Sequence, residues 1–464
     1  MTTLIAIAGL GIICLIAEIF NLRKAIVPVT IIGLLAILCL NVVSIPGVHV
    51  ANLNMEERSF YNNMIVQNNY AILFSSLFIL LTIFLVALSP DFHKEHKAKL
   101  SDFISIKLFL LAGAVAMVSF GNMAMFFLGI EILSISLYIL AASEPKNVSS
   151  NEAGMKYFLM GSFASGFILF GIALIYGATG AFDITAIYEA VSTGAAKGWF
   201  FPGVVLLTIG LLFKIAAVPF HFWAPDVYEG SPALTTATMS TLAKVAAMAA
   251  FYKLMRGINL EVPGTYVTVL IIVSALSMFV GNLTALKQNN VKRMLAFSGI
   301  SHAGFMLMVF LNPPVTAGTL FYYAAAYTLA GIAAFAVVIS VCGDKRNEES
   351  FKFNGLGKTN PLMAAVLTCA LLSMAGIPIF SGFFAKFFLF NQALKAGQVA
   401  IVIIAVVNSI ISVGYYFKLI LAMYTKESTE EKQAVPFAYT AVAVVAILLN
   451  ILLGIFPDMV LGYL

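Results

Sequence analysis

The chain has 464 residues, of which 61% are hydrophobic and 10% charged, and its formal net charge at pH 7 is +5. Soluble domains carry about 25% charged residues, so this composition excludes a soluble globular protein and indicates a polytopic membrane protein. The basic residues lie in short segments between apolar runs, as membrane orientation requires, which gives no support for a nucleic-acid surface.

Apolar windows of about 20 residues predict about fourteen membrane-spanning helices in an all-α fold. The first has no basic residue ahead of it, unlike a signal peptide, and is expected to stay as a span. Most of the 26 lysines and arginines fall in or near the odd-numbered loops, which places those loops in the cytoplasm and both termini outside. The predicted spans cover approximately residues 2–20, 25–43, 68–88, 102–120, 123–142, 152–176, 200–223, 233–255, 265–286, 291–311, 315–342, 361–394, 398–424 and 436–456.

Two of these spans contain a proline close to a lysine. Pro219 follows Lys214 in one apolar run, and Pro378 precedes Lys386 in another. Proline lacks an N–H and clashes with the preceding turn, so both helices are expected to break there. Paired breaks in two halves of a membrane protein are typical of a transporter-type internal repeat. Two ordinary proline kinks are the alternative.

The breaks suggest a division of the chain. Residues 1–100 would form three N-terminal helices, and residues 101–258 a first five-helix repeat. Residues 259–426 would form a second repeat, inverted because each unit has an odd number of helices, and residues 427–464 a C-terminal helix.

Four ionisable residues are expected at membrane depth: Glu131, Lys214, Lys244 and Lys386. A lysine at the centre of a span costs about 2.5 to 3.5 kcal/mol, so these side chains should face a hydrated or protein-lined interior and have a function there. Glu131 has no opposite charge within a helical turn, and Lys214 is its natural partner. Separating the two would favour loss of the lysine proton, so a row of such lysines predicts a proton relay. Charges that only pin helices together are the alternative, although buried ion pairs stabilise poorly.

Three further residues are possible members of the relay. His221 follows the first break, and His302 lies among small and hydroxyl residues; each could bridge lysines or simply be a hydrogen-bonded helix histidine. Lys156 lies near the cytoplasmic end of its span and is either a proton-uptake group or an interface anchor. Lys292 and Arg293, at the start of the tenth span, are interpreted as orientation charges.

No redox or metal motif is visible in the sequence. The four cysteines, Cys14, Cys39, Cys342 and Cys369, are scattered through apolar runs, so zinc, iron–sulfur clusters and a disulfide framework all lack support. Any electron transfer is expected on another chain.

Four stretches resemble a known family: FKIAAVPFHFWAPDVYEGSP, AGIPIFSGFFAKF, NEAGMKYFLMGSF and FSGISHAGFML. They are similar to the signature stretches of the antiporter-like subunit N family of bacterial proton-pumping NADH:quinone oxidoreductase, the respiratory complex I. The resemblance covers most of the chain and is weakest before about residue 67 and after residue 424. The sister subunits L and M, and the large subunits of multi-component Na⁺/H⁺ antiporters, are similar to that family.

The resemblance implies a role for each charged residue. Glu131 and Lys214 would form the coupling pair, Lys244 the connecting lysine, Lys386 the terminal lysine on the exit path, and Lys156 a lysine near the cytoplasmic side. It also implies a bacterial inner-membrane complex in which the neighbours are subunits M and K and the lateral helix of subunit L. NADH, flavin, iron–sulfur clusters and quinone would then belong to other subunits, with no cofactor or metal on this chain.

Three functions compete with proton translocation coupled to quinone reduction elsewhere. A Na⁺/H⁺ antiporter subunit would need several oxygen ligands together, whereas the central charges are mostly lysines. A non-conducting scaffold would tolerate the loss of Lys214 and Glu131. A quinone site on this chain is disfavoured, since no feature of the sequence suggests a headgroup pocket.

Overall fold

A computed structural model of the chain describes residues 2–20, 22–43, 58–94, 100–196, 198–258, 264–311, 316–343, 348–428 and 434–458, so the terminal residues for which an outer location is predicted lie outside these ranges. Helices dominate, which confirms the predicted all-α fold. The longer helices are α1 (Thr2–Ile19), α2 (Arg23–Val43), α3 (Asn69–Ala87), α5 (Leu100–Ser119), α6 (Met123–Ala141), α7 (Val148–Thr179), α9 (Phe200–Lys214), α12 (Lys244–Gly257), α13 (Gly264–Ala285), α14 (Val291–Leu307), α15 (Ala317–Cys342), α17 (Pro361–Ala375), α18 (Ser381–Lys395), α19 (Val399–Thr425) and α20 (Phe437–Ile455). The shorter elements are β1 (Arg58–Phe60), β2 (Ile65–Gln67), α4 (Ser89–Phe92), α8 (Ile184–Ser192), α10 (Trp223–Gly230), α11 (Ala233–Thr238), η2 (Met239–Ala243), η3 (Met308–Leu311), η6 (Ser350–Phe353) and α16 (Leu356–Thr359).

The helices account for the predicted spans. Twelve helices in the described ranges are long and apolar enough to cross a membrane. The other two predicted spans are those with the prolines, and their first helices, α9 and α17, have 15 residues each. Because a crossing needs about 20 residues, each of these two spans is completed by a second helix beyond its break.

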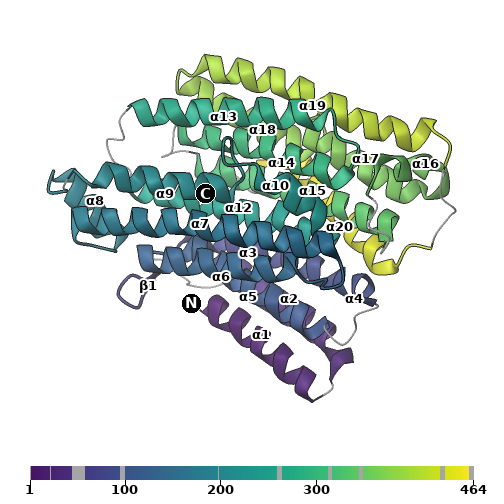
Figure 1. Cartoon of the computed structure of the whole chain (residues 1–464), viewed down its shortest axis with the longest axis horizontal. Helices are drawn as coiled ribbons and strands as arrows, with labels where there is room; N and C mark the ends of the chain where they lie inside the picture. Colours follow the sequence, from purple (N-terminus) through teal and green to yellow (C-terminus); the bar gives the residue numbers. More distant parts are fainter. Residues whose placement is uncertain are drawn as a thin grey trace.

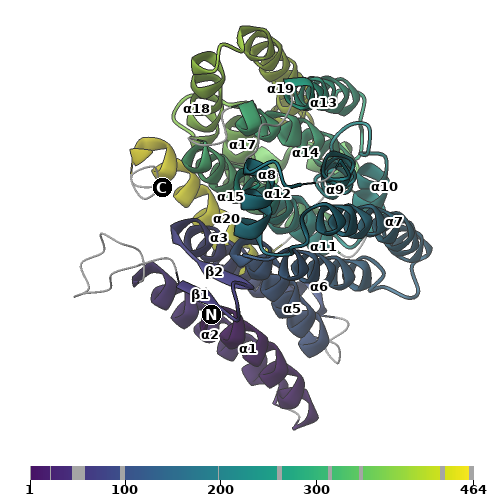
Figure 2. The ribbon, with the colours of Figure 1, turned by 90° about the vertical axis from the view of Figure 1, so that its left-hand side faces the viewer.

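The long helices lie side by side, with α1 and α2 at one edge of the molecule and α13 and α19 at the opposite edge (Figure 1). The turned view places α12, α14 and α15 among the others (Figure 2). These three helices are buried along nearly their whole length, whereas α1 and α2 are mostly exposed. The centre of the bundle is thus lined by protein, which is the environment that a buried charge requires.

The first break separates α9 from α10. Helix α9 ends at Lys214, and Ala216 adopts a positive φ of 57°. The Val218 N–H donates to Ser277 Oγ at 2.9 Å, and Trp223 Nε1 donates to the Phe213 carbonyl at 3.0 Å. Side chains therefore satisfy backbone groups that the interruption frees, as irregular backbone at membrane depth requires.

The second break separates α17 from α18. Gly376 ends α17 in the left-handed conformation with φ of 89°, where glycine carries no steric penalty. The Gly382 N–H donates to Ser373 Oγ at 3.3 Å, and Lys386 Nζ donates to the Ala375 carbonyl at 2.8 Å. The carbonyl group that is free at the end of α17 thus accepts a hydrogen bond from the buried ammonium group of Lys386.

The inverted repeats and their boundaries stay predictions. In their favour, α5 packs against α6 and α7 against α9 in the first half, while α13 packs against α14 and α15 against α17 in the second. The sequence-based map also left out two elements, the β1–β2 hairpin and the short amphipathic helix α8.

The predicted orientation can be tested by cysteine labelling. Lys146 lies just before α7, a single helix of 32 residues, and Thr193 lies beyond it, at the C-terminal end of α8. Both residues are exposed, and we expect them on opposite sides of the membrane. With Cys39 replaced by serine, Lys146→Cys should react with an impermeant thiol reagent only from the cytoplasmic side, and Thr193→Cys only from outside. The reverse pattern would invert the orientation, and labelling of both from one side would show that α7 does not cross.

Candidate functional site: a line of buried charges

The first charged cluster lies where α6, α7 and α9 meet. Lys214 Nζ donates to Ser134 Oγ at 2.7 Å and to Ser165 Oγ at 3.3 Å. Ser165, on α7, donates in turn to Glu131 Oε1 at 2.5 Å. Glu131 and Lys214 therefore share one site, in which a serine hydroxyl joins them.

The reasoning from sequence missed Ser165, although a signal for it exists. Gly161 lies one helical turn earlier on α7, and a Cβ there would come within 2.1 Å of Tyr138 OH. Small residues four positions apart mark a face where membrane helices approach closely. That close approach brings Ser165 to the charged pair and Tyr138 OH to 3.5 Å from Lys214 Nζ.

Lys244 lies in the centre of the molecule, where only 2% of its surface is exposed. Its Nζ has no hydrogen-bond partner among the described residues and lies 5.8 Å from the centroid of the Tyr228 ring. Gly299 on α14 leaves room for it, because a Cβ at that position would come within 2.4 Å of Nζ. The π-helical segment η2 ends immediately before Lys244, and such segments are frequent at functional sites.

Aromatic rings fill the space between the α9 cluster and Lys244. The Tyr138 ring meets the Tyr157 ring edge to face at 4.9 Å, and Tyr157 stacks on Trp223 at 4.7 Å. Trp223 in turn contacts Tyr228 at 6.2 Å. A run of rings thus separates the two charged sites.

The His302 ring on α14 lies 4.7 Å from the Tyr327 ring and 6.2 Å from the Phe305 ring, measured between ring centroids. Tyr327 OH and Lys244 Nζ both adjoin Gly299, and the Phe305 ring carries Lys386 Nζ, so His302 lies between the surroundings of the two lysines. Its Nδ1 is 2.7 Å from Tyr323 OH, and its Nε2 is 3.4 Å from Tyr416 OH. Both ring nitrogens therefore contact phenolic hydroxyls, and the second of these reaches the Ser298 hydroxyl. His302 is part of a connected polar network, which its sequence context alone left undecided.

Lys386 is buried beside the second break. Besides its hydrogen bond to the Ala375 carbonyl, its Nζ lies 4.9 Å from the centroid of the Phe305 ring. Gly376 again provides space, because a Cβ there would come within 3.3 Å of Nζ. The ammonium group is thus held by a helix terminus and an aromatic face, both of which favour a cation.

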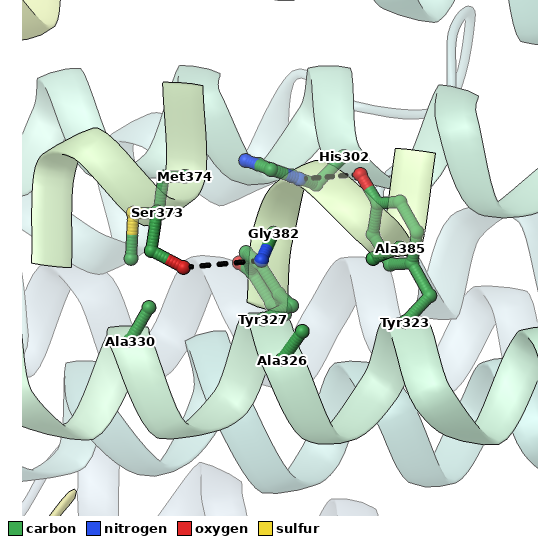
Figure 3. A pocket seen from close by; sticks show the side chains of 9 residues that line it. All are labelled: His302, Tyr323, Ala326, Tyr327, Ala330, Ser373, Met374, Gly382 and Ala385. Atoms are coloured by element: carbon green, nitrogen blue, oxygen red, sulfur yellow. Dashed lines mark hydrogen bonds between the residues drawn. The ribbon is translucent and has the colours of Figure 1, made fainter. Parts of the chain in front are cut away.

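A small cavity adjoins His302 and the second break. Figure 3 shows His302 joined to Tyr323 by a hydrogen bond, with Ser373 and Gly382 on the far side of the cavity. Its volume is about 10 Å³. Its lining is mostly apolar, with His302, the two tyrosines and Ser373 as its polar residues, and its size is at the lower limit for one water molecule.

The structure leaves Lys156 and His221 outside this line. Lys156 Nζ lies 2.7 Å from Glu152 and 3.6 Å from Asp226, with 44% of its side chain exposed. His221 is buried in the first break against the Phe222 ring, and its Nδ1 has no hydrogen-bond partner.

The groups gathered here suit proton transfer. Ammonium, imidazole, phenol and hydroxyl groups can each donate a hydrogen bond, and all except a protonated amine or imidazolium can accept one. Within the described ranges, no group of three or more His, Cys, Asp or Glu could hold a metal ion, and none of the four cysteines forms a disulfide.

Comparison with known proteins places this arrangement in a family. The family described as NADH:quinone oxidoreductase/Mrp antiporter, TM, matches residues 121–412. The chain is 64% identical to NADH-quinone oxidoreductase subunit N of Flavobacterium johnsoniae over all of both chains. It superposes on a chain of respiratory complex I from Thermus thermophilus with bound aureothin with a TM-score of 0.85 and 31% identity, covering 99% of this chain and 98% of that one. A chain of the Mrp complex from Dietzia sp. DQ12-45-1b shares the fold, with a TM-score of 0.86 and 22% identity over 100% of this chain and 95% of that one. The chain therefore belongs to the NADH:quinone oxidoreductase/Mrp antiporter membrane family, among the NADH-quinone oxidoreductase N subunits.

Proposed function

We propose that this chain is a proton-translocating membrane-arm subunit of NADH:quinone oxidoreductase and that its protons move along Glu131, Lys214, Lys244 and Lys386. The observation that supports this most directly is His302, whose ring contacts Tyr327 on the Lys244 side and Phe305 on the Lys386 side and whose ring nitrogens contact two phenolic hydroxyls. Lysines that only fastened helices would not need a polar group placed between them.

The charges differ in how the protein compensates them. Glu131 balances the ammonium of Lys214 through Ser165, whereas Lys244 Nζ has no hydrogen-bond acceptor in the part of the chain that the structure describes. An uncompensated buried ammonium group is costly, so Lys244 is the member of the line that most readily passes its proton on. His302 and the small cavity beside it offer a route from there to Lys386.

The energy for transport would come from quinone reduction in other subunits of a bacterial inner-membrane complex, with protons moving from the cytoplasm to the outside. Flavin, iron–sulfur clusters, NADH and quinone belong to those subunits in this proposal. Glu131 is half-buried and lies on the same stripe of α6 as Ile135 and Ile139, which are 50% and 51% exposed. A carboxylate at an exposed apolar stripe in a membrane needs a protein neighbour, which fits the adjoining subunits M and K and the lateral helix of subunit L.

The nature of the buried groups favours protons over sodium. Sodium, like other hard cations, prefers several oxygen ligands, whereas the central groups here are ammonium and imidazole. A non-conducting scaffold remains the competing function, and the following experiments distinguish it.

Removal of a buried lysine should stop transport without preventing assembly. In complex I containing this chain, Lys244→Met and Lys386→Ala should each lower proton pumping by about tenfold or more, because proton transfer by a positioned group contributes about 10² to 10⁴ in rate. NADH oxidation should fall in parallel through coupling. Pumping is measured as acidification of inverted vesicles, per amount of assembled complex.

Lys418→Met is the matched control, because Lys418 also lies within a long helix but is exposed. It should pump normally. If the two buried-lysine variants pumped protons at the normal rate, the relay would be contradicted and the non-conducting scaffold would be the favoured function.

Ser165→Ala should uncouple the charged pair. A hydrogen bond to a charged group contributes about 1.5 to 3 kcal/mol, so pumping should fall by about tenfold. If the serine acts only through Glu131, Glu131→Gln combined with Ser165→Ala should be no worse than Glu131→Gln alone. Ser136→Ala, whose hydroxyl donates only to the Ile132 carbonyl of its own helix, serves as the control. Strictly additive losses would show that Ser165 does not link the pair.

Gly299→Ala should displace Lys244, since the added methyl group would come within 2.4 Å of Nζ. We expect assembled complex with pumping reduced several-fold, measured in the same vesicles. Gly166→Ala, at a helical position with nothing within 4 Å of its Cβ, should leave pumping unchanged. Equal pumping by the two variants would show that the position of Lys244 does not matter.

A further inference from the structure

A large polar cavity opens at the Lys146 end of α7, the predicted cytoplasmic side. Its volume is about 1140 Å³, and its walls come from the ends of α4, α10, α14 and α15, from the segment that connects α6 to α7, and from Glu348 and Glu349 ahead of η6. We call this cavity the vestibule. Acidic side chains that line it are Glu144, Glu152, Asp226, Glu229, Glu348 and Glu349.

A buried ion pair, Lys292 and Glu348, lies in the wall of the vestibule. Lys292 Nζ lies 2.9 Å from Glu348 Oε1, with 3% and 5% of the two side chains exposed. Lys292 Nζ also donates to the Ser231 carbonyl at 2.9 Å. Lys292 is therefore not the solvent-facing orientation charge that its position in the sequence suggested.

The pair is not needed to hold its loop in place. The Val291 N–H donates to the Glu348 carbonyl at 2.7 Å, and the Ser350 N–H donates to the Asn289 carbonyl at 2.7 Å. These backbone bonds already fasten residues 348–350 to the start of α14. Because buried ion pairs stabilise poorly, the charges call for another role.

Beside the pair lies a buried group without a partner. Ser231 lines the vestibule with 1% of its surface exposed, and its Oγ makes no hydrogen bond to any residue in the described ranges. Three residues earlier, on the last turn of α10, is Tyr228, whose ring centroid is 5.8 Å from Lys244 Nζ. Ser231 thus stands between the vestibule and the surroundings of Lys244.

Helix α14 connects the same two places. Lys292 and Gly299 are seven residues apart, so they lie on one face of the helix at a spacing of about 10 Å along its axis. Gly299 is the residue that makes room for Lys244 Nζ. One buried helix therefore runs from the ion pair to the central lysine.

We infer that the vestibule collects protons and that the Lys292–Glu348 pair is the gate through which they reach Lys244. A proton from the vestibule binds the Glu348 carboxylate and dissolves the ion pair. The Lys292 ammonium then gives its own proton to neutral Lys244, by way of the Ser231 hydroxyl or water beside it. Transfer of the Glu348 proton to the neutral Lys292 amine restores the pair, so one proton has moved inward. This inference rests on the proposed function, for which it supplies the uptake site.

The test replaces the pair by neutral side chains of similar size. In the assembled complex, Lys292→Met combined with Glu348→Gln should leave assembly unchanged and lower proton pumping by about tenfold. The control is Lys287→Met combined with Glu427→Gln, two exposed residues at the same predicted side of the membrane, which should pump normally.

The outcomes separate the gate from the proposed function. If Lys244→Met stops pumping while the neutral pair pumps normally, the gate is wrong and the relay stands. If neither change affects pumping, the proposed function fails as well.

If the double variant does not assemble, the Glu348→Asp variant tests the gate instead. It keeps the acid but shortens it by one methylene, which lengthens the 2.9 Å contact, so a gate predicts assembled complex with pumping reduced several-fold. Normal pumping by Glu348→Asp would overturn the inference.

Discussion

The structure depends on how hydrogen-bond acceptors compensate charged side chains in an apolar interior. Lys386 uses the Ala375 carbonyl, which is available because α17 ends there, and Lys214 at the end of α9 uses hydroxyls of two neighbouring helices. Helix interruptions and buried lysines thus occur together for a physical reason. A continuous helix would have no spare carbonyl to offer, and a lysine without an acceptor would be expensive to bury.

Helix α14 organises the central half of the site. Its N-terminus is capped by the Asn290 side chain, which accepts from the Arg293 N–H at 3.0 Å. Beyond the cap, Lys292, Gly299 and His302 follow one another along a helix that is buried almost throughout. A buried helix fixes the spacing of these groups, and proton transfer needs that fixed spacing because its rate falls steeply as donor and acceptor move apart.

The spans, both breaks and the buried lysines could be predicted from the sequence, because each has a local signal: hydropathy, a proline, or a charge in an apolar run. It was not sufficient for Ser165 or Tyr416, since hydroxyl-bearing residues are common in membrane helices and only packing decides which of them meets a charge. Lys292 was misinterpreted for a related reason. A lysine at a helix start normally reaches solvent, and its burial here depends on Glu348, more than fifty positions away in the chain.

The aromatic run between the α9 cluster and Lys244 bears on how the two parts communicate. Stacked rings such as Tyr157 and Trp223 keep the local dielectric low between the two clusters. A change in the distance between Glu131 and Lys214 would then be felt at Lys244 as a change in electrostatic field, since Coulomb interactions persist over longer distances in such a medium. Glu131 lies at an exposed stripe of α6, where a neighbouring subunit can act on it. Charge compensation therefore offers a physical link from the edge of the subunit to its centre, in addition to proton transfer itself.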